Sequence, residues 1–234
     1  EAKKSDFKFK HIGVIIHASL HSEYGKIFDK IQIKIYTNEK DVLNLIEEAR
    51  KTYKQRDARL ADMTDESVDT FYSCALCQSF APNHICIITP ERSGLCGAYN
   101  WLDGKAAYEM NAAGPNQPVK KGTEIDVVKG QWQNVNEFVY HNSHKTLEMF
   151  NAYSIIEYPM TSCGCFECIS CVLPSTNGIM TVYREYNGMT PVGMKFSTLA
   201  GTVGGGIQTP GFIGHSKHYI GSRKFISAEG GVKR

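Results

Sequence analysis

The pattern of apolar and polar positions predicts a small structural unit in the first quarter of the chain. Residues 30–36 alternate apolar and polar side chains with a period of two, and residues 11–17 form a β-branched apolar run. Both patterns are typical of strands. Residues 38–53 instead carry apolar side chains at helical spacing. The order strand, strand, helix predicts the end of a small α+β domain over residues 1–65.

The pattern over residues 66–234 predicts a second, larger domain. A capping signal at Thr64–Ser67 favours a helix through Val68, Phe71, Tyr72 and Ala75. Further predicted helices cover residues 101–113, 131–143 and 196–200, and predicted strands cover residues 84–89, 154–158 and 178–183. Helices that alternate with strands indicate an α/β (α+β) fold built on a mixed sheet.

Composition narrows the class of protein without identifying it. The chain has 234 residues, 42% of them hydrophobic and 21% charged, as in an ordinary globular protein. A net charge of +2 is too small to indicate nucleic-acid binding. No apolar run reaches the ~18 residues of a membrane span. The absence of an initiator Met and the abrupt end at residues 230–234 suggest a piece of a longer polypeptide.

The cysteines are the strongest chemical signal. The chain has eight, and their close, uneven spacing favours metal binding in a reducing compartment over a disulfide framework. Cys74, Cys77, Cys86 and Cys96 follow the spacing Cys-x2-Cys-x8-Cys-x9-Cys, and we expect the first pair at the end of a helix. Four thiolates suit a [4Fe–4S] cluster or tetrahedral zinc, and unliganded structural cysteines are a third interpretation.

A second set of cysteines lies downstream at Cys163-Gly164-Cys165. Two thiolates and the two intervening peptide nitrogens can surround one metal in a plane, through one six-membered and two five-membered chelate rings. Glycine puts no Cβ in the way of so tight a wrap. A planar set of two nitrogens and two sulfurs suits nickel(II). An ordinary turn with unliganded thiols is the alternative.

Together the two sets resemble one known family. The seven positions from Cys74 to Cys165 are similar to those of acetyl-CoA synthase of the carbon monoxide dehydrogenase complex. Residues 187–194, 196–200 and 204–212 also resemble that family. The resemblance implies a [4Fe–4S] cluster held by Cys74, Cys77, Cys86 and Cys96 and joined to two nickel ions. It also implies that Cys77 bridges the cluster to the proximal nickel, and that Cys163 and Cys165 bridge the two nickels. The amide nitrogens of Gly164 and Cys165 would complete the distal site, and Phe80 would lie beside the open position of the proximal nickel.

The resemblance also implies a function for residues 66–234. The family joins carbon monoxide, a methyl group from a corrinoid iron–sulfur protein, and CoA into acetyl-CoA. A CO dehydrogenase subunit is then an expected partner and the cytoplasm the expected compartment. No nucleic acid or membrane span is expected. A non-catalytic [4Fe–4S] electron carrier and a zinc-structured interaction module are the alternatives.

Three further features have simpler interpretations. We expect Cys168 and Cys171 to lie on a helix that starts after Cys165, as small buried hydrophobic residues. Residues 204–206 are three glycines without a following phosphate-loop signature, which favours close backbone packing near the cluster over contact with CoA phosphates. The remaining candidates, His141, His144, His215 and His218, show no ligand-like pattern, so we expect surface or core roles.

Overall fold

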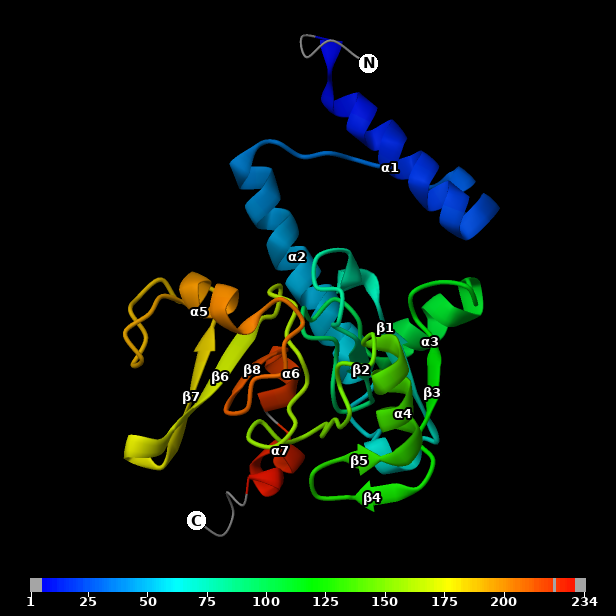
Figure 1. Ribbon diagram of the computed structural model, residues 1–234. Coiled ribbons are helices and arrows are strands. Elements are labelled where there is room, and N and C mark those ends of the chain that lie inside the picture. Colours follow the sequence, from blue (N-terminus) through cyan, green and yellow to red (C-terminus); the bar gives the residue numbers. More distant parts are fainter. Residues whose placement is uncertain (1–5, 221, 230–234) are drawn as a thin grey trace.

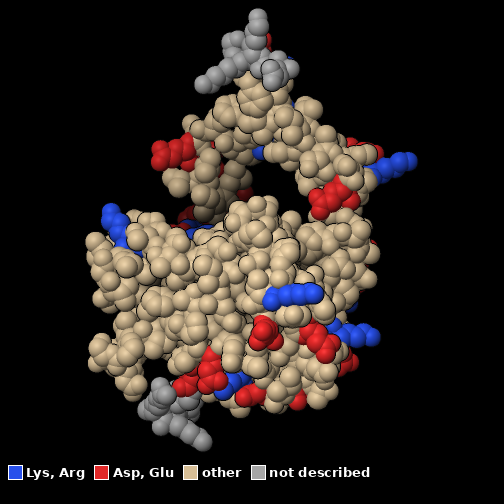
Figure 2. Space-filling model, viewed as in Figure 1, with Lys and Arg blue, Asp and Glu red and all other residues tan. Residues whose placement is uncertain are grey.

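The structure is a computed structural model that describes residues 6–220 and 222–229. Figure 1 shows two regions, which we call the arm (residues 6–55) and the body (residues 56–229). None of the arm residues is buried, whereas the body holds the hydrophobic core. In Figure 2 the arm arches above the body with open space beneath it. No helix in the described part of the chain is long and apolar enough to cross a membrane.

The arm is helical. It contains α1 (Phe9–Tyr24), η2 (Gly25–Lys30) and most of α2 (Glu39–Ala58). Asn38 begins α2, because its side chain accepts hydrogen bonds from the N–H groups of Lys40 and Asp41. The predicted strands are wrong: residues 11–17 lie in α1, and residues 31–38 form no regular element. A strand needs a partner strand, and the described residues offer none here, so the β-branched run takes the locally hydrogen-bonded helix instead.

The body consists of small antiparallel sheets with helices around them. One sheet has the order β2-β1-β3, another pairs β4 with β5, and the third has the order β7-β6-β8. The strands are β1 (Thr70–Cys74), β2 (Cys86–Ile88), β3 (Pro118–Lys120), β4 (Glu124–Asp126), β5 (Gln131–Trp132), β6 (Cys168–Leu173), β7 (Gly178–Tyr183) and β8 (Phe212–His215). The other elements are η3 (Asp65–Ser67), η4 (Leu76–Ser79), α3 (Trp101–Met110), α4 (Gln133–Asn142), η5 (Pro174–Thr176), α5 (Phe196–Val203), α6 (Lys217–Ile220) and α7 (Arg223–Ala228).

The α+β class is confirmed, but the sheet arrangement differs from the prediction. Instead of one mixed sheet, the described residues form separate sheets in which every strand pair is antiparallel. Parallel pairing needs a crossover of a dozen or more residues, whereas only η5 and Asn177 separate β6 from β7. The domain boundary near residue 65 stays a prediction.

Most elements predicted in the body are confirmed, and two are wrong. Helices α3, α4 and α5 and strands β2 and β7 lie where the pattern places them. The helix predicted through Val68–Ala75 is in fact β1, because the Thr64 capping box serves only the short η3 turn. Residues 154–158 form no strand. Their backbone N–H groups bond to side chains instead: Ile155 donates to Glu229 at 2.5 Å, and Glu157 donates to Ser154 at 3.0 Å.

One buried side chain ties the end of α2 to the rest of the body. Arg56, at the end of α2, is buried and donates hydrogen bonds to the backbone oxygens of Gly97 and Ala98 at 3.1 and 2.8 Å. It also forms an ion pair with Asp103 at 3.1 Å. These contacts fix α2 against the loop that carries Cys96, one of the candidate cluster cysteines.

Candidate metal centre

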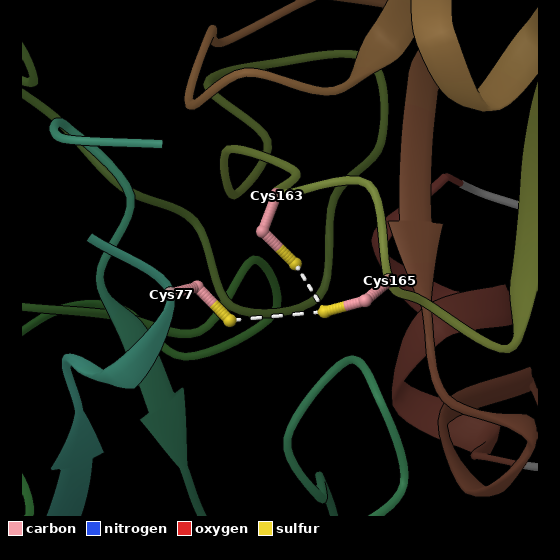
Figure 3. A group of neighbouring side chains, drawn as sticks. All are labelled: Cys77, Cys163 and Cys165. Atoms are coloured by element: carbon pink, nitrogen blue, oxygen red, sulfur yellow. Dashed lines mark hydrogen bonds between the residues drawn. The ribbon is translucent and has the colours of Figure 1, made fainter. Parts of the chain in front are cut away.

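Three sulfur atoms from distant parts of the chain meet in one group. Cys77 lies in η4, and Cys163 and Cys165 lie in the loop before β6. The Sγ of Cys165 lies 3.1 Å from that of Cys163 and 3.7 Å from that of Cys77 (Figure 3). Within the described residues, this is the group of potential ligands compact enough to hold one metal ion. The structure thus brings together the three sulfurs that the family resemblance implies for the proximal nickel.

Glycines set the shape of the loop that carries two of these sulfurs. Gly164 has a φ of +118°, which L side chains rarely adopt. Gly204–Gly206 pack directly on this loop: Gly206 donates a hydrogen bond to the oxygen of Ser162 at 2.8 Å. A Cβ on Gly204 would lie 3.3 Å from the Cα of Gly164. The prediction that the three glycines pack closely on the loop is therefore confirmed.

The three thiols share their protons unequally. The Cys163 thiol, and then the Cys77 thiol, donate hydrogen bonds to the Cys165 sulfur and lower the pKa of Cys165 to about 3. The same hydrogen bond to Cys165 raises the pKa of Cys163 to about 11. Hydrogen bonding to Cys163 and then to Cys165 raises the pKa of Cys77. These shifts favour the thiolate form at Cys165, and thiolates are the form of cysteine that binds metals.

The two backbone N–H groups between these sulfurs differ in their hydrogen bonds. The pKa of Cys163 is lowered in part by a hydrogen bond from the N–H of Cys165, so that nitrogen already faces a sulfur. Among the hydrogen bonds of the described residues, none uses the N–H of Gly164. Within the described residues, the N–H of Gly164 thus has no hydrogen-bond partner, whereas that of Cys165 bonds to the Cys163 sulfur.

The upstream cysteines surround one end of the β2-β1-β3 sheet. Cys74 and Cys86 face each other across β1 and β2, and all four upstream cysteines are free thiols. Burial raises the pKa of Cys74, Cys86 and Cys96, and charge on neighbouring cysteines raises it further. Backbone N–H groups of Leu76, Leu95 and Ala98 oppose these increases by bonding to the three sulfurs.

This donor set fits an iron–sulfur cluster. Hydrogen bonds from backbone N–H groups to sulfur are among the contacts that tune such clusters. The four sulfurs do not form a compact group for a single ion, because the group that does contains only Cys77 from this set. The expected position of Cys74 and Cys77 at a helix end is wrong, since Cys74 ends a strand and Cys77 lies in a 3₁₀ turn.

Two residues in this region give no clear signal in the sequence. His84 is fully buried and contacts Cys86, and burial lowers its pKa to about 4. Arg92 is also buried, and its three guanidinium nitrogens have no hydrogen-bond partner among the described residues. Its guanidinium carbon lies 5.5 Å from the ring centre of Phe150 and 5.0 Å from that of Tyr219, so its charge makes cation–π contacts with both rings. The sequence held one usable signal, the spacing His84-x-Cys86, which places both side chains on the same side of an extended segment.

The remaining site predictions have mixed outcomes. Cys168 and Cys171 are buried, as expected, but they lie on β6 and not on a helix. Their odd spacing on a strand directs them to opposite faces, so they cannot share one metal ion. Phe80 directly follows η4 and is 59% exposed, and its role beside a metal stays a prediction. His215 is a core residue, and the other three histidines are at the surface or partly exposed.

Comparisons with known proteins match this chain along its length. Residues 53–234 match the family model for the C-terminal part of the ACS/CODH beta subunit. Residues 1–42 match a model of the CO dehydrogenase/acetyl-CoA synthase complex beta subunit. The carbon monoxide dehydrogenase/acetyl-CoA synthase subunit alpha of Moorella thermoacetica is 56% identical over 234 residues, which is 100% of this chain and 32% of that protein.

An archaeal relative is also similar. The acetyl-CoA decarbonylase/synthase complex subunit beta of Methanopyrus kandleri is 43% identical over 97% of this chain and 49% of that protein. The chain thus spans a third to a half of the length of these two relatives. A solved C-terminal domain of an acetyl-coenzyme A synthase alpha subunit is 59% identical over 30% of this chain and 50% of that chain, with a TM-score of 0.27. With a TM-score this low, that likeness says nothing of the fold.

Proposed function

This chain belongs to the family of the ACS/CODH beta subunit, in its C-terminal part, and from that premise we propose that it is the metal-bearing catalytic domain of an acetyl-CoA synthase. The reaction assembles acetyl-CoA from carbon monoxide, a methyl group and CoA, which makes the protein an acyltransferase. The observation that carries this proposal is the meeting of Cys77, Cys163 and Cys165 in one group of sulfurs. An electron carrier that used only the upstream cysteines would have no need of this group.

Each cysteine has a role in the proposed centre. Cys74, Cys77, Cys86 and Cys96 hold a [4Fe–4S] cluster. Cys77 also faces the downstream pair, and Cys163, Gly164 and Cys165 hold two nickel ions through their sulfurs and backbone nitrogens. When bound, the nickel pair supplies a soft, reduced metal that can bind carbon monoxide and a methyl group and pass the joined acetyl group to a thiol.

The protein's own residues prepare this site in three ways. The Cys165 sulfur, with its low pKa, is the first ligand available to a metal ion. The positive φ of Gly164 turns the two neighbouring side chains toward one ion. Gly204–Gly206 cover one side of the loop with backbone alone. Phe80 is exposed and directly follows the turn that carries Cys77, and we assign it to the wall of the substrate position.

The proposed partners follow from the substrates. A CO dehydrogenase subunit supplies carbon monoxide, and a corrinoid iron–sulfur protein supplies the methyl group. We place the reaction in the cytoplasm, because all eight cysteines are free thiols and a reducing compartment keeps them so.

Metal analysis tests this proposal. We expect about two nickel and about four iron atoms per chain, the iron held by four thiolates as in a cubane. An EPR signal that appears under carbon monoxide and involves both metals would support a shared centre. Iron without nickel would contradict the proposal in favour of an electron carrier, and zinc alone would favour a structural module. Formation of acetyl-CoA from carbon monoxide, a methylated corrinoid protein and CoA then tests the activity itself.

A further inference from the structure

His84 connects the two sets of cysteines. Its ring is fully buried, with Nε2 3.1 Å from the Sγ of Cys86 and Nδ1 2.8 Å from the hydroxyl of Thr161. Cys86 belongs to the upstream set, and Thr161 lies two residues before Cys163. Thr161 is itself fully buried. One histidine ring therefore joins strand β2 to the loop that carries the downstream sulfurs.

The two neighbours determine which ring nitrogen carries the proton. A cysteine that binds a metal has lost its proton, so in the contact with Cys86 only the ring can be the donor. An imidazole with a single N–H, on Nε2, satisfies both contacts, because the hydroxyl of Thr161 can donate to Nδ1. The proton therefore lies on Nε2. Nδ1 is then an acceptor, and the hydroxyl of Thr161 donates to it.

We propose that His84 is a positioning residue that raises the reduction potential of the iron–sulfur cluster through its hydrogen bond to the Cys86 sulfur. In this proposal, Thr161 holds the ring in the tautomer that can donate. The inference rests on the proposed function, because it needs a cluster on Cys86. Reduction adds negative charge to the cluster and its sulfurs, and a donor aimed at one sulfur stabilises that charge. Without the donor, the cluster is harder to reduce.

Two substitutions of His84 separate its two contacts. The amide of His84→Asn reaches the position of Nδ1 and keeps the contact with Thr161, but it leaves Cys86 without a side-chain donor. The longer His84→Gln reaches the position of Nε2 and keeps the donor. The measurement is an EPR-monitored redox titration of the metal-loaded protein. We expect His84→Asn to lower the equilibrium constant for reduction about tenfold, or ~59 mV for one electron. His84→Gln should stay close to the wild-type potential.

Thr161 provides a second, independent pair of variants in case His84→Asn does not assemble its cluster. Thr161→Val keeps the shape and removes the hydroxyl, so the ring is free to change tautomer and the potential should fall by a smaller amount. Thr161→Ser keeps the hydroxyl and should match the wild type. Equal potentials in the wild type and in either Thr161→Val or His84→Asn, at equal iron content, would overturn the inference. A wild-type protein that assembles no iron–sulfur cluster would instead contradict the proposed function.

Discussion

The arm and the body contain the same kinds of apolar residue, but these side chains are exposed in the arm and largely buried in the core of the body. Ile15, in α1, is 61% exposed, whereas Ile169, in β6, is fully buried between β7 and β8. Helices of the arm are held together by local hydrogen bonds, and the strands of the body by partners far away in the sequence. Every cysteine lies in the body. The geometry of the candidate metal centre therefore depends on long-range packing, to which α2 adds the contacts of Arg56 at its end.

The largest expected difference between the two regions concerns glycines with a positive φ. Proline fixes φ near −65° and has no N–H, so Gly164→Pro removes both the loop shape and one proposed nitrogen ligand. We expect nickel to be lost completely, with all eight cysteines still present. Gly25, in the arm, is the matched control, because its φ is +67° and, like Gly164, it has open space where a side chain would stand. Gly25→Pro should retain full nickel content, as measured by plasma emission spectrometry.

Gly164→Ala separates the loss of the N–H from the change in loop shape. Alanine keeps the N–H, but a φ of +118° is strained for any L residue. We therefore expect partial nickel loading in Gly164→Ala, between the wild type and Gly164→Pro. Full loading of Gly164→Pro would contradict the amide-ligand hypothesis.

The second prediction concerns the loss of stability at acidic pH, which we expect in the body because of His215. Burial lowers the pKa of His215 to about 4, and its Nε2 lies 2.7 Å from the hydroxyl of Ser170. Between the usual pKa of about 6.5 and the lowered value, the unfolded chain binds a proton that the folded chain does not. The free energy of unfolding should therefore fall as the pH drops from about 6.5 to about 4, by on the order of 3 kcal/mol.

Tryptophan fluorescence can follow this loss in the body alone. Both tryptophans, Trp101 and Trp132, lie there, so urea unfolding followed by their emission does not report on the arm. In His215→Asn, the dependence of the free energy of unfolding on pH should become shallower. An unchanged pH dependence in this variant would show that His215 does not titrate as its burial requires.

The third prediction compares the same substitution in the two regions. Gly214, in β8, packs against the ring of Phe166, and a Cβ there would overlap that ring. Gly214→Ala should lower the free energy of unfolding by about 1–3 kcal/mol and disturb Cys165, the neighbour of Phe166. At Gly13, inside α1, an added Cβ would have no atom closer than 3.9 Å.

Gly13→Ala should therefore have the opposite effect. It should stabilise the helix locally by about 0.5–1 kcal/mol, because alanine loses less backbone freedom than glycine. Far-UV circular dichroism should show this gain, while the tryptophan transition stays in place. Destabilisation of the body by Gly13→Ala would mean that the arm packs on it more tightly than the structure shows.

The smallest expected effect concerns Cys168 and Cys171. Both are buried in β6 on opposite faces of the sheet, so neither serves the metal centre. Cys168→Ala and Cys171→Ala should each lower the free energy of unfolding by at most roughly 1–2 kcal/mol. Nickel and iron should remain at wild-type levels in the double variant. Loss of either metal would indicate one larger site that extends from Cys163 to Cys171.

The sequence predicted which cysteines meet better than it predicted the structure that supports them. Cysteine spacing favoured metal binding but left unliganded thiols open, and the family resemblance then implied the meeting of Cys77, Cys163 and Cys165 that the structure shows. Strand patterns in the arm failed, because whether residues 11–17 pair depends on a partner that periodicity does not reveal. Arg92 could not be identified from the sequence, and His84 only by its spacing to Cys86, since both depend on burial beside residues distant in the chain, such as Thr161 for His84.

Nickel X-ray absorption on the metal-loaded protein tests the central claim most directly. The claim is that the backbone nitrogens of Gly164 and Cys165, together with the sulfurs of Cys163 and Cys165, hold one nickel in a plane. The account predicts a nickel environment of mixed nitrogen and sulfur donors, with the planar signature of a four-coordinate d8 ion. A tetrahedral environment with sulfur donors alone would contradict it, and would leave Cys77, Cys163 and Cys165 as an ordinary thiolate site.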